Sequence, residues 1–173
     1  MPFSLDRQSP DAESPILVLS TGGTIDKVYF DATSEYEVGD SIIPELLREA
    51  NVQVPFRHIG LMRKDSLDLS DEDRLAVCSA ITAEPEQRVV VTHGTDTMTA
   101  TAAALNGLTD RTIVLTGSMA PARFARTDAT FNVGMAIAAV QTLPPGVYLA
   151  MNGQVFVASE VHKDRDRRAF VTR

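Results

Sequence analysis

Short apolar runs recur along the chain, and each of them ends on or near a glycine. These runs read as strands that are buried on both faces, because an apolar run without sustained alternation is typical of a parallel sheet covered on two sides. We predict one strand in each of the ranges 16–19, 52–60, 88–94, 111–118 and 146–153.

The segments between these runs carry a helical pattern. Ser70 precedes a first turn rich in acids, and Asp96 precedes the run "TMTATAAAL", so both residues are typical helix N-caps. The last helical segment ends before Pro144, which cannot continue a helix. We predict helices within 40–50, 70–82, 96–107 and 127–143.

Strands that alternate with helices predict the fold class. We expect an α/β protein, a three-layer αβα sandwich around a mainly parallel, doubly wound sheet of the flavodoxin-like type with right-handed crossovers. Residues 1–14 are polar and contain prolines, so we expect a flexible N-terminal arm before a single domain over 15–173. Residues 26–40 are aromatic and acidic without helical period, and predict a short hairpin or a mobile flap.

Charge and composition exclude several classes of function. The net charge is −7, so we expect no nucleic-acid partner. No apolar stretch approaches the ~18 residues of a membrane span and no secretory signal is visible, so we expect a cytoplasmic protein without a membrane partner. Cys78 is the only cysteine, and no second histidine stands at ligand spacing, so we expect no metal site. The basic C-terminal segment 161–173 is interleaved with acids and is typical of a solvated surface.

Two polar segments directly follow predicted strands. "STGGT" ends with Thr24, and "THGTDTM" contains His93, Thr95 and Asp96. In an open α/β sheet the ligand crevice lies beyond the carboxyl ends of the strands, so both segments should meet at one rim. Taken alone, the glycine pair is a tight turn without the spacing of a phosphate or dinucleotide loop, and His93 is typical of a structural histidine with satisfied hydrogen bonds.

Together and in this order, the segments resemble the asparaginase/glutaminase family, the bacterial-type amidohydrolases with a threonine nucleophile. "TGGTI" and "THGTDTM" look like the two signatures of that family, "KDSLDL" like its substrate-binding loop, "TGSMAP" like the loop after the next strand, and "SEVHKD" like the segment with an essential lysine. The resemblance runs from residue 16 to the end of the chain and covers what is only the larger, N-terminal domain of longer relatives.

The resemblance implies roles for individual residues. Thr24 would attack the side-chain amide carbon, and Tyr36 would orient or deprotonate it. Thr95, Asp96 and Lys163 would form a second hydroxyl, carboxylate and ammonium set.

The resemblance also implies a substrate site. Ser66 and Asp96 would hold the α-carboxylate and α-amino groups of the amino acid, and Ser118 would line the same site. Backbone amides near Gly94 and Thr95 would stabilise the oxyanion of the transition state. No metal or organic cofactor is implied.

The sequence departs from the family pattern at two positions. Leu67 stands where a glutamine usually contacts the substrate's amino group, and Ala120 stands where an arginine is common. Longer relatives complete each site with groups from a neighbouring subunit's C-terminal domain. We therefore expect either a homodimer or homotetramer that supplies substitute groups, or an open site with a high KM.

Three functions are compatible with these residues. The first is hydrolysis of L-asparagine to L-aspartate and ammonia through an acyl-threonine, with glutamine as a minor substrate. The second is an ammonia-generating subunit of a transamidation complex. The third is a non-catalytic amino-acid sensor of the same fold, although a binding protein has no need of both Thr24 and Thr95.

Overall fold

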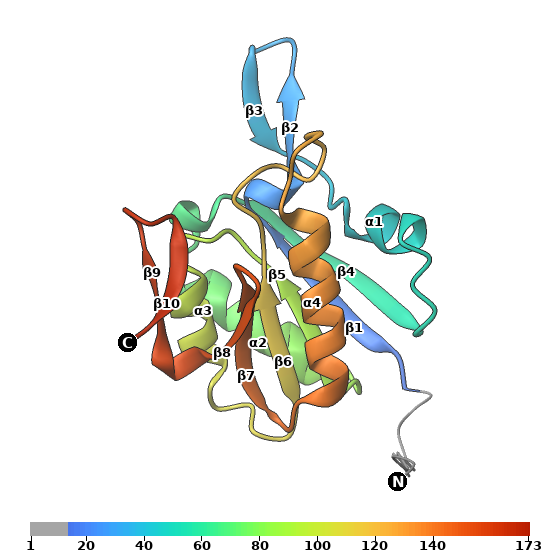
Figure 1. Cartoon of the computed structure of the whole chain (residues 1–173). Coiled ribbons are helices and arrows are strands. Elements are labelled where there is room, and N and C mark those ends of the chain that lie inside the picture. The colour runs from blue at the N-terminus through green and yellow to red at the C-terminus, as the bar shows by residue number, and fades with distance from the viewer. Residues whose placement is uncertain (1–13) are drawn as a thin grey trace, which may run out of the picture.

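The computed structural model describes residues 14–173, so the flexible arm expected at 1–14 lies outside the described residues apart from Ser14. In this part of the chain, six strands form a central sheet in the order β4-β1-β5-β6-β7-β8 (Figure 1). Neighbouring strands are parallel except β8, which runs antiparallel to β7. The strands are β1 (Ile16–Gly22), β4 (Phe56–Lys64), β5 (Arg88–Thr92), β6 (Thr112–Thr116), β7 (Gly146–Met151) and β8 (Gln154–Val157).

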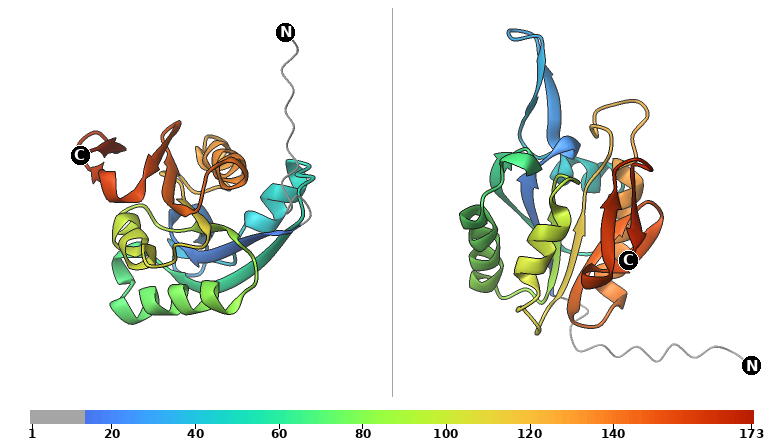
Figure 2. Two further views of the ribbon diagram at one scale, coloured as in Figure 1. Left: turned by 90° about the horizontal axis from the view of Figure 1, so that it is seen from below. Right: turned by 90° about the vertical axis from the view of Figure 1, so that its left-hand side faces the viewer.

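Helices cover both faces of this sheet. The helices are α1 (Ile43–Glu49), α2 (Asp71–Ala83), α3 (Met98–Leu105) and α4 (Ala129–Thr142). Side chains of α1 and α4 pack on one face and those of α2 and α3 on the other, which gives the three layers seen in Figures 1 and 2. The predicted αβα architecture with a mainly parallel sheet is thereby confirmed.

Strand β1 shows why the apolar runs lack alternation. Leu17 and Leu19 pack with α2 and α3, whereas Ile16 and Val18 pack with α1 and α4. All four side chains are completely buried. Full burial of such side chains contributes about 1.5–3 kcal/mol each, so both helical layers are held by the same central strands.

The predicted element ends differ from the observed ones at β4. We predicted a strand over 52–60, but it begins at Phe56 and continues to Lys64. Pro55 has no N–H to give to a ladder, although its carbonyl accepts a hydrogen bond from the Ile16 amide at 2.8 Å. The cap predicted at Ser70 is confirmed, because its hydroxyl and the Asp73 carboxylate form a capping box at the start of α2.

Two hairpins flank the rim of the sheet. Residues 26–40 contain β2 (Lys27–Phe30) and β3 (Glu35–Val38), which project away from the body of the molecule (Figure 1). The C-terminal segment forms a second hairpin from β9 (Val161–Asp164) and β10 (Ala169–Thr172). Our interpretation of this second segment as merely solvated surface is wrong, because its residues Val161 and Phe170 are buried in the core.

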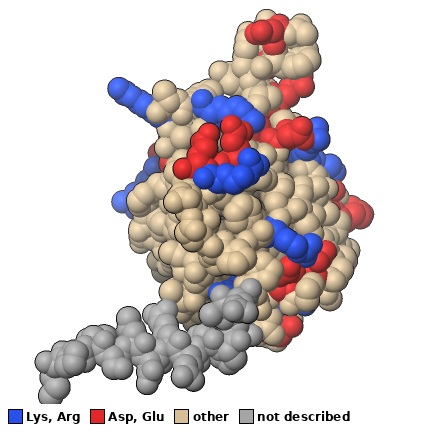
Figure 3. All heavy atoms as spheres, turned by 90° about the vertical axis from the view of Figure 1, so that its right-hand side faces the viewer, with Lys and Arg blue, Asp and Glu red and all other residues tan. Residues whose placement is uncertain are grey.

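The surface carries charges of both signs. On the face shown in Figure 3, basic and acidic side chains lie close together beneath the projecting hairpin. Ion pairs on the surface include that between Arg63 and Asp40. None of the helices within residues 14–173 has the length and hydropathy needed to cross a membrane.

Candidate functional site

Loops that follow β1, β4 and β5 meet in close backbone contact. Gly23 has φ of 89°, and a Cβ added there would lie 2.4 Å from the Gly94 amide nitrogen. A Cβ added to Gly94 would lie 2.6 Å from the Ser66 Cβ. Because real Cβ atoms do not approach so closely, only glycine allows these three loops to converge at one rim.

The loop after β6 is fixed at the same rim. A Cβ on Gly117 would lie 2.2 Å from the His93 carbonyl oxygen. The Asp128 carboxylate accepts hydrogen bonds from the amides of Met119, at 3.0 Å, and Ala120, at 3.1 Å. Asn132 donates to the Gly117 carbonyl at 3.0 Å, so α4 holds this loop in position.

Lys163 joins two of the predicted catalytic residues. Its Nζ donates to Thr95 Oγ1 at 2.8 Å and to Asp96 Oδ1 at 2.8 Å. The Lys163 side chain is 14% exposed and that of Asp96 34%. Hydrogen bonds from an ammonium to a carboxylate are among the stronger ones in proteins, and a position that is partly shielded from water preserves much of their strength.

Thr24 lies in the same cavity as these three residues. The cavity has a volume of about 290 Å³ and is lined by Thr24, Thr95, Asp96, Met119, Lys163, Arg165 and Arg168. Thr24 is half-buried, and its hydroxyl forms no hydrogen bond to another described residue. The cavity therefore contains one free hydroxyl and one hydroxyl that is bonded to an ammonium group.

The position of Asp96 corrects the cap predicted for α3. The helix begins at Met98, and its N-cap residue is Thr97 without a side-chain capping bond. The Asp96 carboxylate instead accepts the bond from Lys163, and the Thr97 hydroxyl donates to the Ser66 carbonyl at 2.6 Å. Asp96 thus serves the cavity rather than the helix end.

His93 is a structural residue in this arrangement. It is fully buried, with Nδ1 2.7 Å from the Gly94 carbonyl oxygen and Nε2 2.7 Å from Thr101 Oγ1. Burial lowers the pKa of His93 to about 4, so the ring is neutral at physiological pH. No cluster of three or more His, Cys, Asp or Glu residues within 14–173 is placed to hold a metal ion.

Three of the predicted substrate-binding residues adjoin the cavity without lining it. Ser66 and Gly94 are buried against each other where the loops after β4 and β5 meet. Ser118 is buried, and its hydroxyl donates to the Ala120 carbonyl. These residues build the wall behind Thr95 and Met119.

Tyr36 lies apart from the other predicted residues. It belongs to β3 of the projecting hairpin, and its side chain is 51% exposed. Its ring packs edge-to-face against Tyr29, with centroids 5.4 Å apart, and against Phe124, with centroids 5.6 Å apart. The structure does not bring Tyr36 to the wall of the cavity.

Three further residues line the cavity that we did not predict from the sequence, namely Met119, Arg165 and Arg168. The two arginines lie in the turn between β9 and β10, where Arg168 has φ of 51°. The available signal was that the apolar residues Val161 and Phe170 flank a charged segment, as the two strands of a hairpin flank a turn. The many charges led us to interpret the whole segment as solvated surface instead.

Asp26 follows Thr24 by two residues and carries a shifted pKa. It is 1% exposed, and burial raises its pKa to about 6 against opposing hydrogen bonds from the Ile42 amide and Ser41 and the charge of Arg123. Its Oδ1 accepts from the Ile42 amide at 3.0 Å, and its carbonyl accepts from the Gly39 amide at 3.0 Å. Asp26 therefore joins the turn that contains Thr24 to the segment that follows β3 at the base of the first hairpin.

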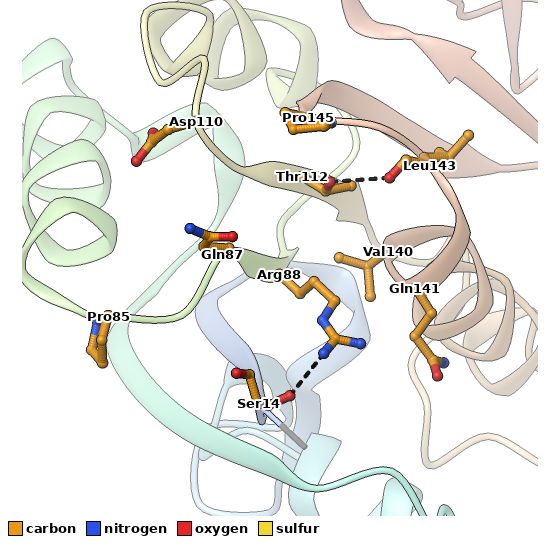
Figure 4. Close-up of a pocket in the computed structure, with 10 residues that line it drawn as sticks. All are labelled: Ser14, Pro85, Gln87, Arg88, Asp110, Thr112, Val140, Gln141, Leu143 and Pro145. Atoms are coloured by element: carbon orange, nitrogen blue, oxygen red, sulfur yellow. Dashed lines mark hydrogen bonds between the residues drawn. The ribbon is translucent and has the colours of Figure 1, made fainter. Parts of the chain in front are cut away.

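A larger cavity, of about 390 Å³, lies at the opposite ends of the strands. Figure 4 shows its residues, among them Arg88, which donates to the Ser14 carbonyl at 3.2 Å, and Thr112, whose hydroxyl donates to the Leu143 carbonyl at 3.2 Å. Its lining contains no lysine or histidine. Cavity size alone therefore does not select the candidate site; the smaller cavity is the one that brings the hydroxyls of Thr24 and Thr95 together with Lys163.

Comparison with known proteins agrees with this geometry. The chain matches the family described as "Asparaginase, N-terminal" over residues 15–171. An L-asparaginase of Thermococcus kodakarensis is 30% identical over 162 residues, which are 86% of this chain and 47% of that protein. A glutamyl-tRNA(Gln) amidotransferase component from Methanococcus vannielii is 30% identical over 170 residues, which are 89% of this chain and 37% of that protein.

A solved structure shares the fold as well. The crystal structure of a probable cytoplasmic L-asparaginase from Campylobacter jejuni has a TM-score of 0.76 at 30% sequence identity, over 92% of this chain and 51% of that chain. The chain spans about half the length of the L-asparaginases that it matches. The matched residues 15–171 contain Thr24, Thr95, Asp96 and Lys163, and the chain belongs to the asparaginase family, whose N-terminal domain it matches.

Proposed function

We propose that this protein is an L-asparaginase, which converts L-asparagine to L-aspartate and ammonia through an acyl-threonine, with glutamine as a minor substrate. The observation that carries the proposal is the bridge from Lys163 to Thr95 and Asp96, in the same cavity as the free hydroxyl of Thr24. Family membership supports amidohydrolase activity in general.

The proposed first step is attack of Thr24 Oγ1 on the side-chain amide carbon. A threonine hydroxyl is a weak nucleophile and needs a group that takes its proton. Lys163 donates to Thr95 Oγ1, so the hydrogen of the Thr95 hydroxyl is free to point into the cavity. In the proposal, the set formed by Thr95, Asp96 and Lys163 polarises the amide of the substrate and protonates the departing ammonia.

The proposed second step is hydrolysis of the acyl-threonine. Backbone amides of Gly94 and Thr95 stabilise the oxyanion in both steps, because fixed donors at a developing charge need no reorganisation. Water then attacks the ester and gives a proton to the set of Thr95, Asp96 and Lys163, which replaces the proton lost to ammonia. The oxygen of Thr24 takes back its own proton, and L-aspartate leaves. No metal or organic cofactor takes part in the proposed steps.

Tyr36 keeps the proposed role of orienting or deprotonating Thr24. Because the tyrosine packs on Tyr29 and Phe124 in this structure, the role requires the β2–β3 hairpin to fold over the cavity when substrate binds. The exposed position of this hairpin leaves it room to move (Figure 1). The proposed substrate site is completed by the residues of the wall behind Thr95 and Met119, namely Ser66, Gly94 and Ser118.

A second candidate function is supply of ammonia within a transamidation complex. The 30% identity to the amidotransferase component from Methanococcus vannielii favours it as a specific alternative. The two functions differ in what receives the ammonia, so release into solution from free L-asparagine or L-glutamine separates them.

We further propose that the protein is cytoplasmic and forms a homodimer or homotetramer, in which the neighbouring protomer helps to close the site. The cavity is bordered by exposed arginines, as expected for a site that is open in one protomer. An open site lets water in and weakens the electrostatics of the reaction, which favours a high KM.

The test is coupled-enzyme detection of ammonia from purified protein with L-asparagine and with L-glutamine. We expect release from L-asparagine in the wild type, and losses of about 10²–10⁴-fold in kcat for Thr24→Ala and for Lys163→Met. Thr112→Ala, which removes a hydroxyl from the opposite cavity, is the matched control and should keep wild-type kcat.

The proposal has two distinct ways to fail. Near-full ammonia release by Thr24→Ala would show that the nucleophile is another group. Binding of L-asparagine without any ammonia release by the wild type would favour the sensor, or an amidotransferase component that works only with its partners.

A further inference from the structure

The loop between β4 and α2 carries Ser66, and contacts from separate elements hold it. Lys64 pairs with the Asp73 carboxylate of α2 at 2.7 Å. The Thr97 hydroxyl, which lies in the segment after β5, donates to the Ser66 carbonyl at 2.6 Å. Both contacts come from the body of the molecule, so they fix the loop relative to the central sheet.

A further contact to this loop comes from the projecting β2–β3 hairpin. Lys27 is the first residue of β2 and forms an ion pair with Asp65, with Nζ 2.9 Å from Oδ2. The two side chains are 28% and 31% exposed, so water screens the pair only in part. The hydrogen bond from Lys27 is the main cause that lowers the pKa of the Asp65 carboxyl below its ordinary value.

Asp65 uses its two carboxylate oxygens on different segments. Oδ2 faces Lys27, whereas Oδ1 accepts a hydrogen bond from the Leu67 amide at 3.3 Å. This second bond caps the short 3-10 helix Ser66–Asp68, in which the Asp68 amide donates to the Asp65 carbonyl at 3.0 Å. One carboxylate therefore joins the hairpin to the turn that carries Ser66.

Lys27 is placed between the turn of the proposed nucleophile and the rest of the hairpin. The 3-10 turn Thr24–Asp26 ends directly before it. Lys27 lies opposite Val38, at the base of the hairpin, and Tyr36 lies two residues before Val38 on β3. A movement of Tyr36 towards the cavity would therefore turn the hairpin about the base that Lys27 ties to the loop between β4 and α2.

We infer that Lys27 and Asp65 are positioning residues, whose ion pair couples the position of the β2–β3 hairpin to that of Ser66. The inference rests on the proposed function, in which the hairpin folds over bound substrate and Ser66 holds its α-carboxylate. Neither residue of the pair lines the cavity of Thr24, so both act through the two segments that they join. Substrate on Ser66 favours one position of the loop, and the ion pair passes that preference to the hairpin.

Hydrogen exchange followed by mass spectrometry on the full chain tests the coupling without turnover. A coupling acts in both directions. Lys27→Met should therefore speed exchange in 65–69, and Asp65→Asn should speed it in 27–38, each about fivefold. Asp65→Asn keeps an oxygen for the Leu67 amide, so the cap of the turn is retained. Lys27→Arg keeps the cation and should match the wild type.

Lys64→Met is the matched control, since it removes a lysine beside the same loop but breaks an ion pair with α2 instead of the hairpin. Its exchange in 27–38 should stay within about twofold of the wild type. Wild-type exchange in 65–69 of Lys27→Met and in 27–38 of Asp65→Asn would overturn the inference. So would equal acceleration of 27–38 in Lys64→Met and Asp65→Asn.

Kinetics separate this inference from the proposed function. Lys27→Met should raise KM for L-asparagine about fivefold with a smaller effect on kcat, because the groups around Lys163 are intact. Loss of folded protein alone would lower kcat at an unchanged KM, and Lys27→Arg should restore the wild-type KM. A wild-type KM in Lys27→Met contradicts the positioning role. Reciprocal exchange effects without ammonia release from any amide contradict the hydrolase instead and leave the coupling of the two segments standing.

Discussion

The two hairpins at the rim of the sheet are built on different anchors. The β9–β10 hairpin inserts Val161 and Phe170 into the core, whereas the β2–β3 hairpin exposes about half of the side chains of Tyr29 and Tyr36. The first holds Lys163 within 2.8 Å of two partners, and the second carries its predicted catalytic residue away from the cavity. A hairpin fixes a functional side chain only where it is itself fixed by buried apolar residues.

The largest effect is expected when the anchored hairpin loses its anchor. Phe170→Ala removes an aromatic side chain that is only 1% exposed and should lower the free energy of unfolding by about 3–5 kcal/mol. It should also lower kcat in protein that is still folded, because β9 no longer positions Lys163. Urea unfolding followed by circular dichroism measures the first, and ammonia release at low temperature the second.

Phe131→Ala provides the control, since Phe131 lies on α4 with a 62% exposed side chain. We expect it to change stability by no more than about 0.5 kcal/mol and to leave kcat unaltered. Comparable losses of stability and kcat in the two variants would show that the burial of Phe170 is not what anchors the β9–β10 hairpin.

A smaller effect is expected at the base of the projecting hairpin, through Asp26. Its pKa of about 6 lies above the ordinary value of 3.8, so the folded state binds a proton more tightly than the unfolded state. The contribution of Asp26 to the free energy of unfolding should therefore fall as pH rises from about 4 to 6, by about 2–3 kcal/mol in all, and should not recover above that window.

Asp26→Asn has no proton to exchange and should lack this fall. Denaturant titrations at about pH 3, 4, 5, 6 and 7 bracket the two pKa values and measure the difference between the wild type and Asp26→Asn. Asp31→Asn, at the exposed end of the same hairpin, should retain the wild-type fall. If the free energy of unfolding of Asp26→Asn changes with pH as it does in the wild type, another group causes the change. Protonation of Asp26 then does not stabilise the base of the hairpin.

The same contrast explains which features could be predicted from the sequence. The central strands were predictable because apolar residues on both faces leave a continuous run, as in Val89–Val91 of β5. The link from Thr95 to Lys163 spans 68 positions and depends on the packing of Phe170, which no local pattern reveals. Resemblance to the family suggested Lys163, whereas the charge pattern alone indicated a solvated surface.

Asp96 and β4 show the limits of local rules. A capping residue was predicted correctly at Ser70, where its hydroxyl is left to the helix end, but not at Asp96, where Lys163 takes the carboxylate. The predicted range of β4 began too early because we continued the strand across Pro55, although a proline ends the hydrogen-bond ladder of a strand. Arg165 and Arg168 were missed because a turn among charged residues has no apolar signature.

The smallest effect on global stability is expected when the projecting hairpin loses an aromatic contact. Tyr29→Ser removes an edge-to-face pair with Tyr36 from a side chain that is 53% exposed. Such pairs contribute about 0.5–1.5 kcal/mol, and an exposed pair lies at the low end, so the free energy of unfolding should change by about 0.5 kcal/mol. Amides of β2 and β3 should nevertheless exchange hydrogen faster, because the contact holds the hairpin locally.

Hydrogen exchange followed by mass spectrometry resolves the two hairpins in one experiment. In Tyr29→Ser the acceleration should be confined to 27–38 and absent from 161–172, whereas Tyr29→Phe, which keeps the ring, should match the wild type. A loss of protection in both hairpins would mean that they are coupled through the cavity, since neither core cluster of the described residues joins them. Protection lost only in the first hairpin would show that it opens independently, as a segment must if Tyr36 is to move over bound substrate while Lys163 stays in place.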